Sequence, residues 1–302
     1  MASQRDVKNR ISSVKNIEKI TRALETVAAA RLRRAEQRID ALRPYAEAIR
    51  RMTRQAADAA GAEASRLPLL AEHESERKVG VLLVTGDRGL AGAFNSQIIR
   101  AGTRLGRELH EDGKTALWYA TGRRGVSSLT FRGLELSGSY TGFSDRPAYA
   151  DARTIADDLI EGYVDGDLDR VELIYNRYVS PLTQTVTQER LLPLSAEAIT
   201  GEEEDQQPDD AGPRGPRPLV EYEPDPEEIL RRLIPDYVEI SIYRALVEST
   251  AGFFGAQMTA MRNASENARE LISTYTLQMN RARQAEITQE ILEVVAGAEG
   301  LS

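Results

Sequence analysis

The sequence predicts an α+β fold in which a long helix at each end of the chain lies beside the other, and a central α/β domain carries a mixed sheet flanked by helices. Three observations lead to this prediction. From Ala2 to Ala60 the chain has no glycine and one proline, Pro44, and its apolar residues recur at helical spacing. The last third, from about Pro226 to Val295, is also rich in helical patterns. Between them, short apolar runs alternate with helical stretches, as in α/β domains.

Two apolar series follow the first helix. The first has steps of three or four residues and comprises Val7, Ile11, Val14, Ile17, Ile20, Leu24 and Val27. After one phase adjustment, the second has the 3.5-residue average of a coiled-coil seam and comprises Ala28, Leu32, Ala35, Ile39, Leu42, Ala46 and Ile49. A helix of this length extends about 90 Å, so only another rod can cover the stripe. We therefore expect the terminal helices to lie side by side, with Leu24 and Val27 opposite Met279–Val295.

The middle of the chain is predicted to be a separate α/β domain. Its elements are a strand Val79–Thr85, a helix from about Asn95 to His110, a strand Thr115–Thr121, a helix Ala148–Val164, and strands Val171–Val179 and Thr183–Leu192. Either Asn95 or Ser96 can cap the first of these helices. Ser180-Pro181 separates the last two strands, which therefore form an antiparallel hairpin in a mixed sheet.

The segment GDRGLAGAFN, residues 86–95, follows a strand and precedes a helix, as a phosphate-binding loop does. It has no G-K-[ST], it does not fit G-x-G-x-x-G, and Asp87 would repel a phosphate. We therefore interpret it as a tight turn that packs a helix on a strand. No Ser-His-Asp set, carboxylate pair or metal-ligand spacing stands out elsewhere in the sequence. We therefore expect no catalytic residue, no cofactor and no metal.

Composition excludes several classes of protein. The chain has no cysteine and two histidines, which excludes disulfides, thiolate metal sites and cysteine nucleophiles, and disfavours a histidine metal cluster. It has no run of about 18 apolar residues that would span a membrane. The first ten residues lack the apolar region of a signal peptide. We therefore expect a protein on the cytoplasmic side with no direct membrane span.

The net charge of −8 conceals an asymmetry between the two ends. Residues 1–60 contain 14 Lys and Arg against 7 Asp and Glu, whereas residues 225–302 contain 7 against 12. The densest basic patch is Arg31, Arg33 and Arg34, with Arg38 one turn further. This patch is either a solvated face or a track that meets acidic loops of a protein partner. Nucleic acid is disfavoured because the chain is acidic overall and its basic residues do not alternate with aromatic ones.

One segment is predicted to be a mobile surface loop. Residues 195–218 contain seven acidic residues, two arginines, four prolines and three glycines, which cannot form a packed core. The sequence thus divides into an N-terminal coiled-coil helix (1–60), a linker (61–77), the central domain (78–193), the acidic insert (194–218) and a C-terminal coiled-coil helix (219–302).

Several segments resemble the gamma subunits of F-type, proton-translocating ATP synthases. The segments that resemble signatures of this family are residues 13–36, 86–95, 222–230, 258–272 and 280–298, in the expected order along nearly the whole chain. The resemblance implies an antiparallel coiled coil made by both chain ends, with an α/β domain beside its base. The absence of cysteine argues against the thiol-switched chloroplast type and favours the bacterial type.

The resemblance also implies a function. In this family the coiled coil is the central rotor shaft inside a ring of three alpha and three beta subunits, and its foot sits on a membrane ring of c subunits beside epsilon. Proton flow turns the c ring, and the shaft drives ATP synthesis at the alpha/beta catalytic sites. The resemblance therefore implies a non-catalytic subunit, peripheral to the cell membrane on its cytoplasmic side.

Individual contact residues follow from the same resemblance. Those expected to contact a beta subunit are Arg31, Arg33, Arg34, Arg283, Gln284 and Thr288. Those expected at the foot, near the c ring and epsilon, are Tyr222 and Glu223. The chain departs from the family pattern at Glu286, which stands where a small residue is usual. It also departs at Gly252 and Gly255, which we expect to loosen the last helix, and we expect Pro235 to bend or interrupt that helix.

Two other functions remain open from the residues alone. The first is a free-standing coiled-coil scaffold protein that dimerises through its apolar stripe. The second is a nucleotide-binding enzyme centred on Gly86–Asn95.

Overall fold

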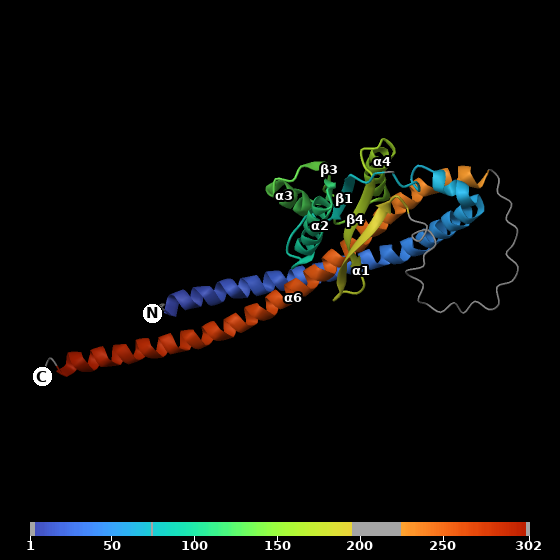
Figure 1. Cartoon of the computed structure of the whole chain (residues 1–302). Helices are drawn as coiled ribbons and strands as arrows, with labels where there is room; N and C mark the ends of the chain where they lie inside the picture. The colour runs from blue at the N-terminus through green and yellow to red at the C-terminus, as the bar shows by residue number, and fades with distance from the viewer. Residues whose placement is uncertain (1–3, 74, 195–224, 300–302) are drawn as a thin grey trace. The chain divides into compact units, whose positions relative to one another are not determined.

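The computed structural model describes residues 4–73, 75–194 and 225–299 (Figure 1). Its tertiary contacts divide the chain into two compact units. We call residues 1–30 with 257–302 the two-helix unit, and residues 31–256 the sheet unit. Two long helices contribute to both units: α1, Gln4–Ala60, and α6, Pro226–Glu299. The long helix predicted at each end of the chain is therefore confirmed.

The sheet has five strands in the order β3-β2-β1-β4-β5. They are β1 Lys78–Val84, β2 Thr115–Thr121, β3 Leu136–Tyr140, β4 Arg170–Tyr178 and β5 Gln184–Leu192. Strand β1 pairs in parallel with β2 and β4, β2 pairs in parallel with β3, and β4 pairs with β5 in antiparallel. The predicted mixed sheet and its hairpin are therefore confirmed.

The sheet unit also contains shorter helices. They are α2 Phe94–Glu111, α3 Arg123–Phe131, α4 Tyr149–Val164 and a 3-10 helix Gly61–Arg66. The predicted cap of α2 is wrong, because the helix follows Ala93 without a side-chain cap and Asn95 already lies in its first turn. The side chain of Asn95 bonds the loop before the helix instead.

Helix α3 and strand β3 were not predicted from the sequence. The strand LSGSY lies at the edge of the sheet, alternates between half-buried and exposed residues, and contains Gly138. Such a strand lacks the apolar run by which the other strands were found. The helix α3 is only nine residues long and buries Gly125 and Leu129, so its apolar periodicity is short.

The core covers both faces of the sheet. On one face, Leu82 packs in a cluster with Leu159 and Tyr163 of α4 and Val238 of α6. On the other face, the neighbouring Leu83 meets α2 at Gly102, where an added Cβ would lie 2.5 Å from its side chain. Burial on both faces explains why β1 reads as an uninterrupted apolar run.

The predicted interruption of the last helix is wrong. Helix α6 continues through Pro235, because Leu230, Ile234 and Val238 are fully buried on either side of it. The two glycines have a packing role as well. A Cβ at Gly252 would lie 3.2 Å from the ring of Phe94, and one at Gly255 would lie 3.0 Å from the carbonyl oxygen of Pro181. Both glycines therefore allow α6 to approach the rest of the sheet unit closely.

In the two-helix unit, α1 and α6 are antiparallel, as predicted. Arg262 forms an ion pair with Glu25, and Arg269 forms one with Glu18. The covered positions on each helix alternate steps of three and four. On α1 they include Val7, Ile11, Val14, Glu18, Thr21, Glu25 and Ala28, and on α6 they include Met261, Ser265, Ala268, Ile272, Tyr275 and Met279.

The rotational phase of α1 differs from the prediction. No phase adjustment occurs: Glu18, Thr21 and Glu25 occupy the seam, and their apolar neighbours Ile17 and Ile20 are 52% and 59% exposed. Three polar contacts compensate, with Thr21 and Ser265 hydroxyls 2.7 Å apart between the two ion pairs. We call this set the polar clasp.

The register also corrects the expected pairing of Leu24 and Val27 with Met279–Val295. Because Glu25 pairs with Arg262 and Glu18 with Arg269, the partner of a residue closer to the N-terminus lies further along α6. Leu24 and Val27 therefore lie near Arg262 rather than near Met279.

The exposure of neighbouring residues gives a direct test of this phase. Because the chain has no cysteine, Ile20→Cys and Thr21→Cys each introduce one thiol. We expect the thiol at position 20 to react with a maleimide about tenfold faster than the thiol at position 21, which is buried against Ser265. The reverse order would place α1 in the apolar phase that the sequence pattern predicts, and equal rates would contradict the phase observed in the structure.

Candidate functional site

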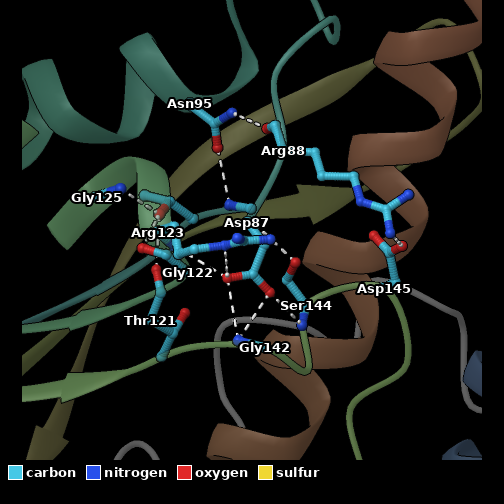
Figure 2. A network of polar contacts seen from close by, with 12 residues as sticks. Asp87, Arg88, Asn95, Thr121, Gly122, Arg123, Gly125, Gly142, Ser144 and Asp145 are labelled. Atoms are coloured by element: carbon cyan, nitrogen blue, oxygen red, sulfur yellow. Dashed lines mark hydrogen bonds and ion pairs between the residues drawn. The ribbon is translucent and has the colours of Figure 1, made fainter. Parts of the chain in front are cut away.

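The glycine-rich loop 86–95 is built around the carboxylate of Asp87. This carboxylate accepts hydrogen bonds from the backbone N–H groups of Arg123 at 3.0 Å, Gly142 at 3.0 and 3.1 Å, and Ser144 at 3.1 Å (Figure 2). The backbone N–H of Asp87 donates to the Ser144 hydroxyl at 2.8 Å. The loop after β1 is thus joined to the segments that follow β2 and β3.

Electrostatics favours the charged form of Asp87. Burial raises the pKa of its carboxyl, but the hydrogen bonds from Gly142, Arg123 and Ser144 outweigh burial and hold the pKa below its usual value. These N–H groups are the kind that bind a phosphate in a nucleotide loop, and here they bind a carboxylate of the chain itself. The contacts therefore favour the interpretation of the loop as a turn that packs a helix on a strand.

Two further contacts hold the ends of the loop. The side chain of Asn95 accepts from the N–H of Gly86 at 2.8 Å and donates to the carbonyl of Arg88 at 3.1 Å. The hydroxyl of Thr85 donates to the carbonyl of Thr121 and accepts from the N–H of Gly125. Figure 2 shows the Asn95 side chain between its two partners in the loop.

A hollow of about 400 Å³ lies beside this loop in the sheet unit. We call it the basic groove; its lining residues are Arg31, Arg34, Ala35, Arg38, Asp145, Arg146, Thr250 and Phe254. The guanidinium of Arg31 lies 3.0 Å from the Asp145 carboxylate and 5.6 Å from the centre of the Phe254 ring. Arg88 reaches the same carboxylate oxygen at 3.3 Å.

The groove contains only part of the basic patch that the sequence singled out. Arg31 and Arg34 line it, whereas Arg33 is exposed on α1 and is not part of the lining. Sequence reasoning missed Arg88, Asp145 and Arg146, because they come from loops far along the chain. The only signals for them were that Arg88 lies within the glycine-rich loop 86–95 and that Asp145 and Arg146 follow β3.

A larger cavity of about 600 Å³ lies elsewhere in the sheet unit. Its arginines are Arg43, Arg50, Arg51 and Arg54 of α1, Arg177 of β4 and Arg244 of α6. Glu248 also lines it, and burial raises the pKa of that carboxyl against the opposing effect of Arg244 and Arg177. No sequence pattern predicts this cavity, because its residues come from three separate elements, α1, β4 and α6.

The remaining expected contact residues on α6 lie in the two-helix unit. Every described side chain from Arg283 to Ala296 is exposed, including those of Gln284 and Thr288. The hydroxyl of Thr288 donates to the carbonyl of Gln284 at 2.9 Å. Apolar residues share this exposure, between 45% and 72%, and they are Ile287, Ile291, Leu292, Val294 and Val295. This end of α6 therefore presents apolar surface that α1 does not cover.

Some expected residues lie outside the described part of the chain. They are Tyr222 and Glu223, together with residues 195–218 of the acidic insert. Among the residues that the structure does describe, no cluster of His, Cys, Asp or Glu side chains could hold a metal ion. None of the described helices is long and apolar enough to cross a membrane.

Comparison with known proteins gives matches along the whole chain. A family described as ATP synthase matches residues 3–301. The ATP synthase gamma chain of Rubrobacter xylanophilus is 47% identical over 302 residues, covering 100% of this chain and 99% of the relative. That of Moorella thermoacetica is 43% identical over 303 residues, covering 100% of both.

Solved structures share the fold. A chain of the Euglena gracilis mitochondrial ATP synthase aligns with a TM-score of 0.65 at 17% identity, covering 99% of this chain and 94% of that one. A chain from the central stalk and c ring of the Tetrahymena thermophila mitochondrial enzyme aligns with a TM-score of 0.58 at 23% identity, covering 82% and 99%.

The Asp87 network predicts an acid-dependent stability. Asp87→Asn removes the charged acceptor, and we expect it to lower the free energy of unfolding at pH 7 by about 2 kcal/mol. Because the folded-state pKa of Asp87 is lowered, its contribution is complete above the unfolded-state pKa and is lost as pH falls through the folded-state value. Denaturant titrations should therefore show the difference at pH 7 and lose it in strong acid. A difference that does not change with pH would contradict the role given to this carboxylate.

Two glycines with positive φ differ in how closely other atoms approach them. Gly122 has a φ of 79° and an added Cβ would lie 2.2 Å from the carbonyl oxygen of Thr85, whereas Gly113 has a φ of 75° and open space around it. We expect Gly113→Ala to cost about 1 kcal/mol of unfolding free energy, the penalty of the conformation alone. Gly122→Ala should cost at least twice that, measured by urea unfolding. Similar losses in the two variants would show that the loop relaxes around the new methyl group.

Proposed function

The chain belongs to the ATP synthase gamma chain family, and on that premise we propose that it is the central rotor shaft of a bacterial F-type ATP synthase. In this role it couples proton flow through the membrane c ring to ATP synthesis at the alpha and beta subunits. The observation that carries the proposal is the antiparallel two-helix unit, in which α6 presents an exposed apolar end.

The helices meet the mechanical demand of a shaft. Helix α1 has 57 residues and α6 has 74, and each is a single helix that continues through one internal proline, Pro44 in α1 and Pro235 in α6. In the two-helix unit, the alternating steps of three and four let side chains of the two helices interlock, which resists sliding. The exposed apolar residues from Ile287 to Val295 suit non-directional contact with a surrounding sleeve, because such contact has no fixed geometry to break on rotation.

The proposed contacts with a beta subunit fall into two groups. Arg283, Gln284 and Thr288 are exposed on α6 and accessible to a loop of a partner. In the sheet unit, Arg33 and Arg34 are exposed as well, whereas Arg31 is held by Asp145 and Phe254. We assign the foot contacts with the c ring and epsilon to Tyr222 and Glu223 by family resemblance alone.

The proposal includes a non-catalytic role and a peripheral position on the cytoplasmic side of the cell membrane. The internal pairing of Asp87 supports the first point, since the backbone N–H groups of Arg123, Gly142 and Ser144 that face the glycine-rich loop already have an acceptor in its Asp87. The alternative of a free-standing scaffold requires the stripe of α1 to bind a second copy. Within the two-helix unit α6 of the same chain already packs on one face of α1, through Glu18, Thr21 and Glu25, which weakens this alternative although Ile17 and Ile20 of the stripe stay exposed.

A matched pair of variants tests the proposed beta contact. In the membrane-bound complex assembled around this chain, Arg283→Ala should lower ATP synthesis about tenfold, as expected when one charge-assisted hydrogen bond is lost. Arg281→Ala removes an equally exposed charge two residues earlier and should leave synthesis near the original rate. Equal losses of ATP synthesis in the two variants would show that Arg283 makes no specific contact with the beta subunit.

Assembly tests the proposal as a whole. The chain should co-purify with alpha and beta subunits, and ATP synthesis should fail without it. Full ATP synthesis in cells that lack the chain would exclude the shaft.

A further inference from the structure

The basic groove already holds a carboxylate of its own. One oxygen of Asp145 lies 3.0 Å from Arg31 and 3.3 Å from Arg88, between a helix and the glycine-rich loop. Figure 2 shows Arg88 extending toward this carboxylate. The Asp145 side chain is 30% exposed, so solvent and a partner both reach it. The arginines at the groove therefore already bind one carboxylate, that of Asp145.

Positive charge in the groove exceeds what Asp145 neutralises. Its lining contains Arg34, Arg38 and Arg146 besides Arg31. Within the described part of the chain, none of these three arginines forms an ion pair with a carboxylate. They come from one face of α1 and from the loop after β3, so they surround the hollow from two sides.

The floor of the groove is apolar. Phe254 and Ala35 are both 2% exposed, and the Phe254 ring lies under the Arg31 guanidinium. Because the chain itself already covers this floor, a partner meets the arginines of the groove and almost no apolar surface. Arginines that come from two segments fit a protein segment that presents several carboxylates.

We propose that Asp145 is an internal competitor for an acidic segment of a partner protein. In the free chain it binds Arg31 and Arg88; a partner carboxylate then displaces it from Arg31 and lies across Arg34, Arg38 and Arg146. Asp145 thus weakens the attraction and favours partners that present several carboxylates. The identity of this partner as a beta subunit rests on the proposed function, but the chemistry of the groove does not.

The decisive variant is Asp145→Asn, which keeps the size of the side chain and removes its charge. Binding is measured with the full chain and two probes: a synthetic peptide of ten glutamates, and the assembled alpha and beta subunits. We expect the substitution to strengthen binding about two- to fivefold, the range for partly exposed charge pairs, and the gain to vanish in high salt. Asp145→Ser serves as a second variant, and the melting temperature of each verifies folding.

Two arginine variants complete the experiment: one should weaken binding, and the other is a control. Arg146→Ala should weaken binding of both probes about two- to fivefold. Arg107→Ala removes an exposed charge on α2, outside the groove, and should have no comparable effect. Weaker or unchanged binding by Asp145→Asn, or equal effects of the two arginine variants, would overturn the proposal. If the affinities for the peptide change as expected across the variants and those for the alpha–beta assembly do not, the groove binds acidic segments but its partner is not a beta subunit.

Discussion

The seam between α1 and α6 in the two-helix unit is the constraint on which much else depends. Its positions keep a single heptad register from Val7 to Ala28, and Leu32 and Ala35 continue the same spacing along α1. To keep that register, the helix places Glu18, Thr21 and Glu25 where apolar residues would ordinarily pack. The polar clasp makes this placement tolerable, because the buried hydroxyl of Thr21 finds its partner in Ser265.

The same arrangement leaves apolar residues of both helices exposed. With Thr21 in the seam, Ile17 and Ile20 turn away from α6, and the far end of α6 carries further uncovered apolar residues. Exposed apolar surface of this extent marks interaction sites in soluble proteins. It is therefore consistent with a helix pair that works inside a larger assembly and not as an isolated hairpin.

The sheet unit uses internal carboxylates where a nucleotide-binding loop would bind the phosphates of a ligand. Asp87 binds the backbone N–H groups at the carboxyl ends of neighbouring strands, and Asp145 joins two arginines at the adjacent groove. The contacts of Asp87 join the loop to the segments after β2 and β3, and Arg88 of the same loop reaches the groove. The two carboxylates differ in one respect: Asp87 is almost enclosed, whereas Asp145 can be exchanged for a partner group.

The amino-acid sequence by itself determined where the long helices and the apolar strands lie, the mixed character of the sheet, and the family. Periodicity and short signatures are local properties, so they can be recognised in the sequence without knowledge of the fold. Tertiary structure decided the edge strand β3, the use of Asn95 as a loop tie, and the continuity of α6 through Pro235. It also decided the rotational phase of α1, because adjacent residues of a helix point about 100° apart. The contact that places Thr21 instead of Ile20 in the seam comes from Ser265 of α6, which is far away in sequence. Likewise, only the folded chain brings Asp145 and Arg146 to the basic stretch of α1, because no local pattern relates a loop to a distant helix face.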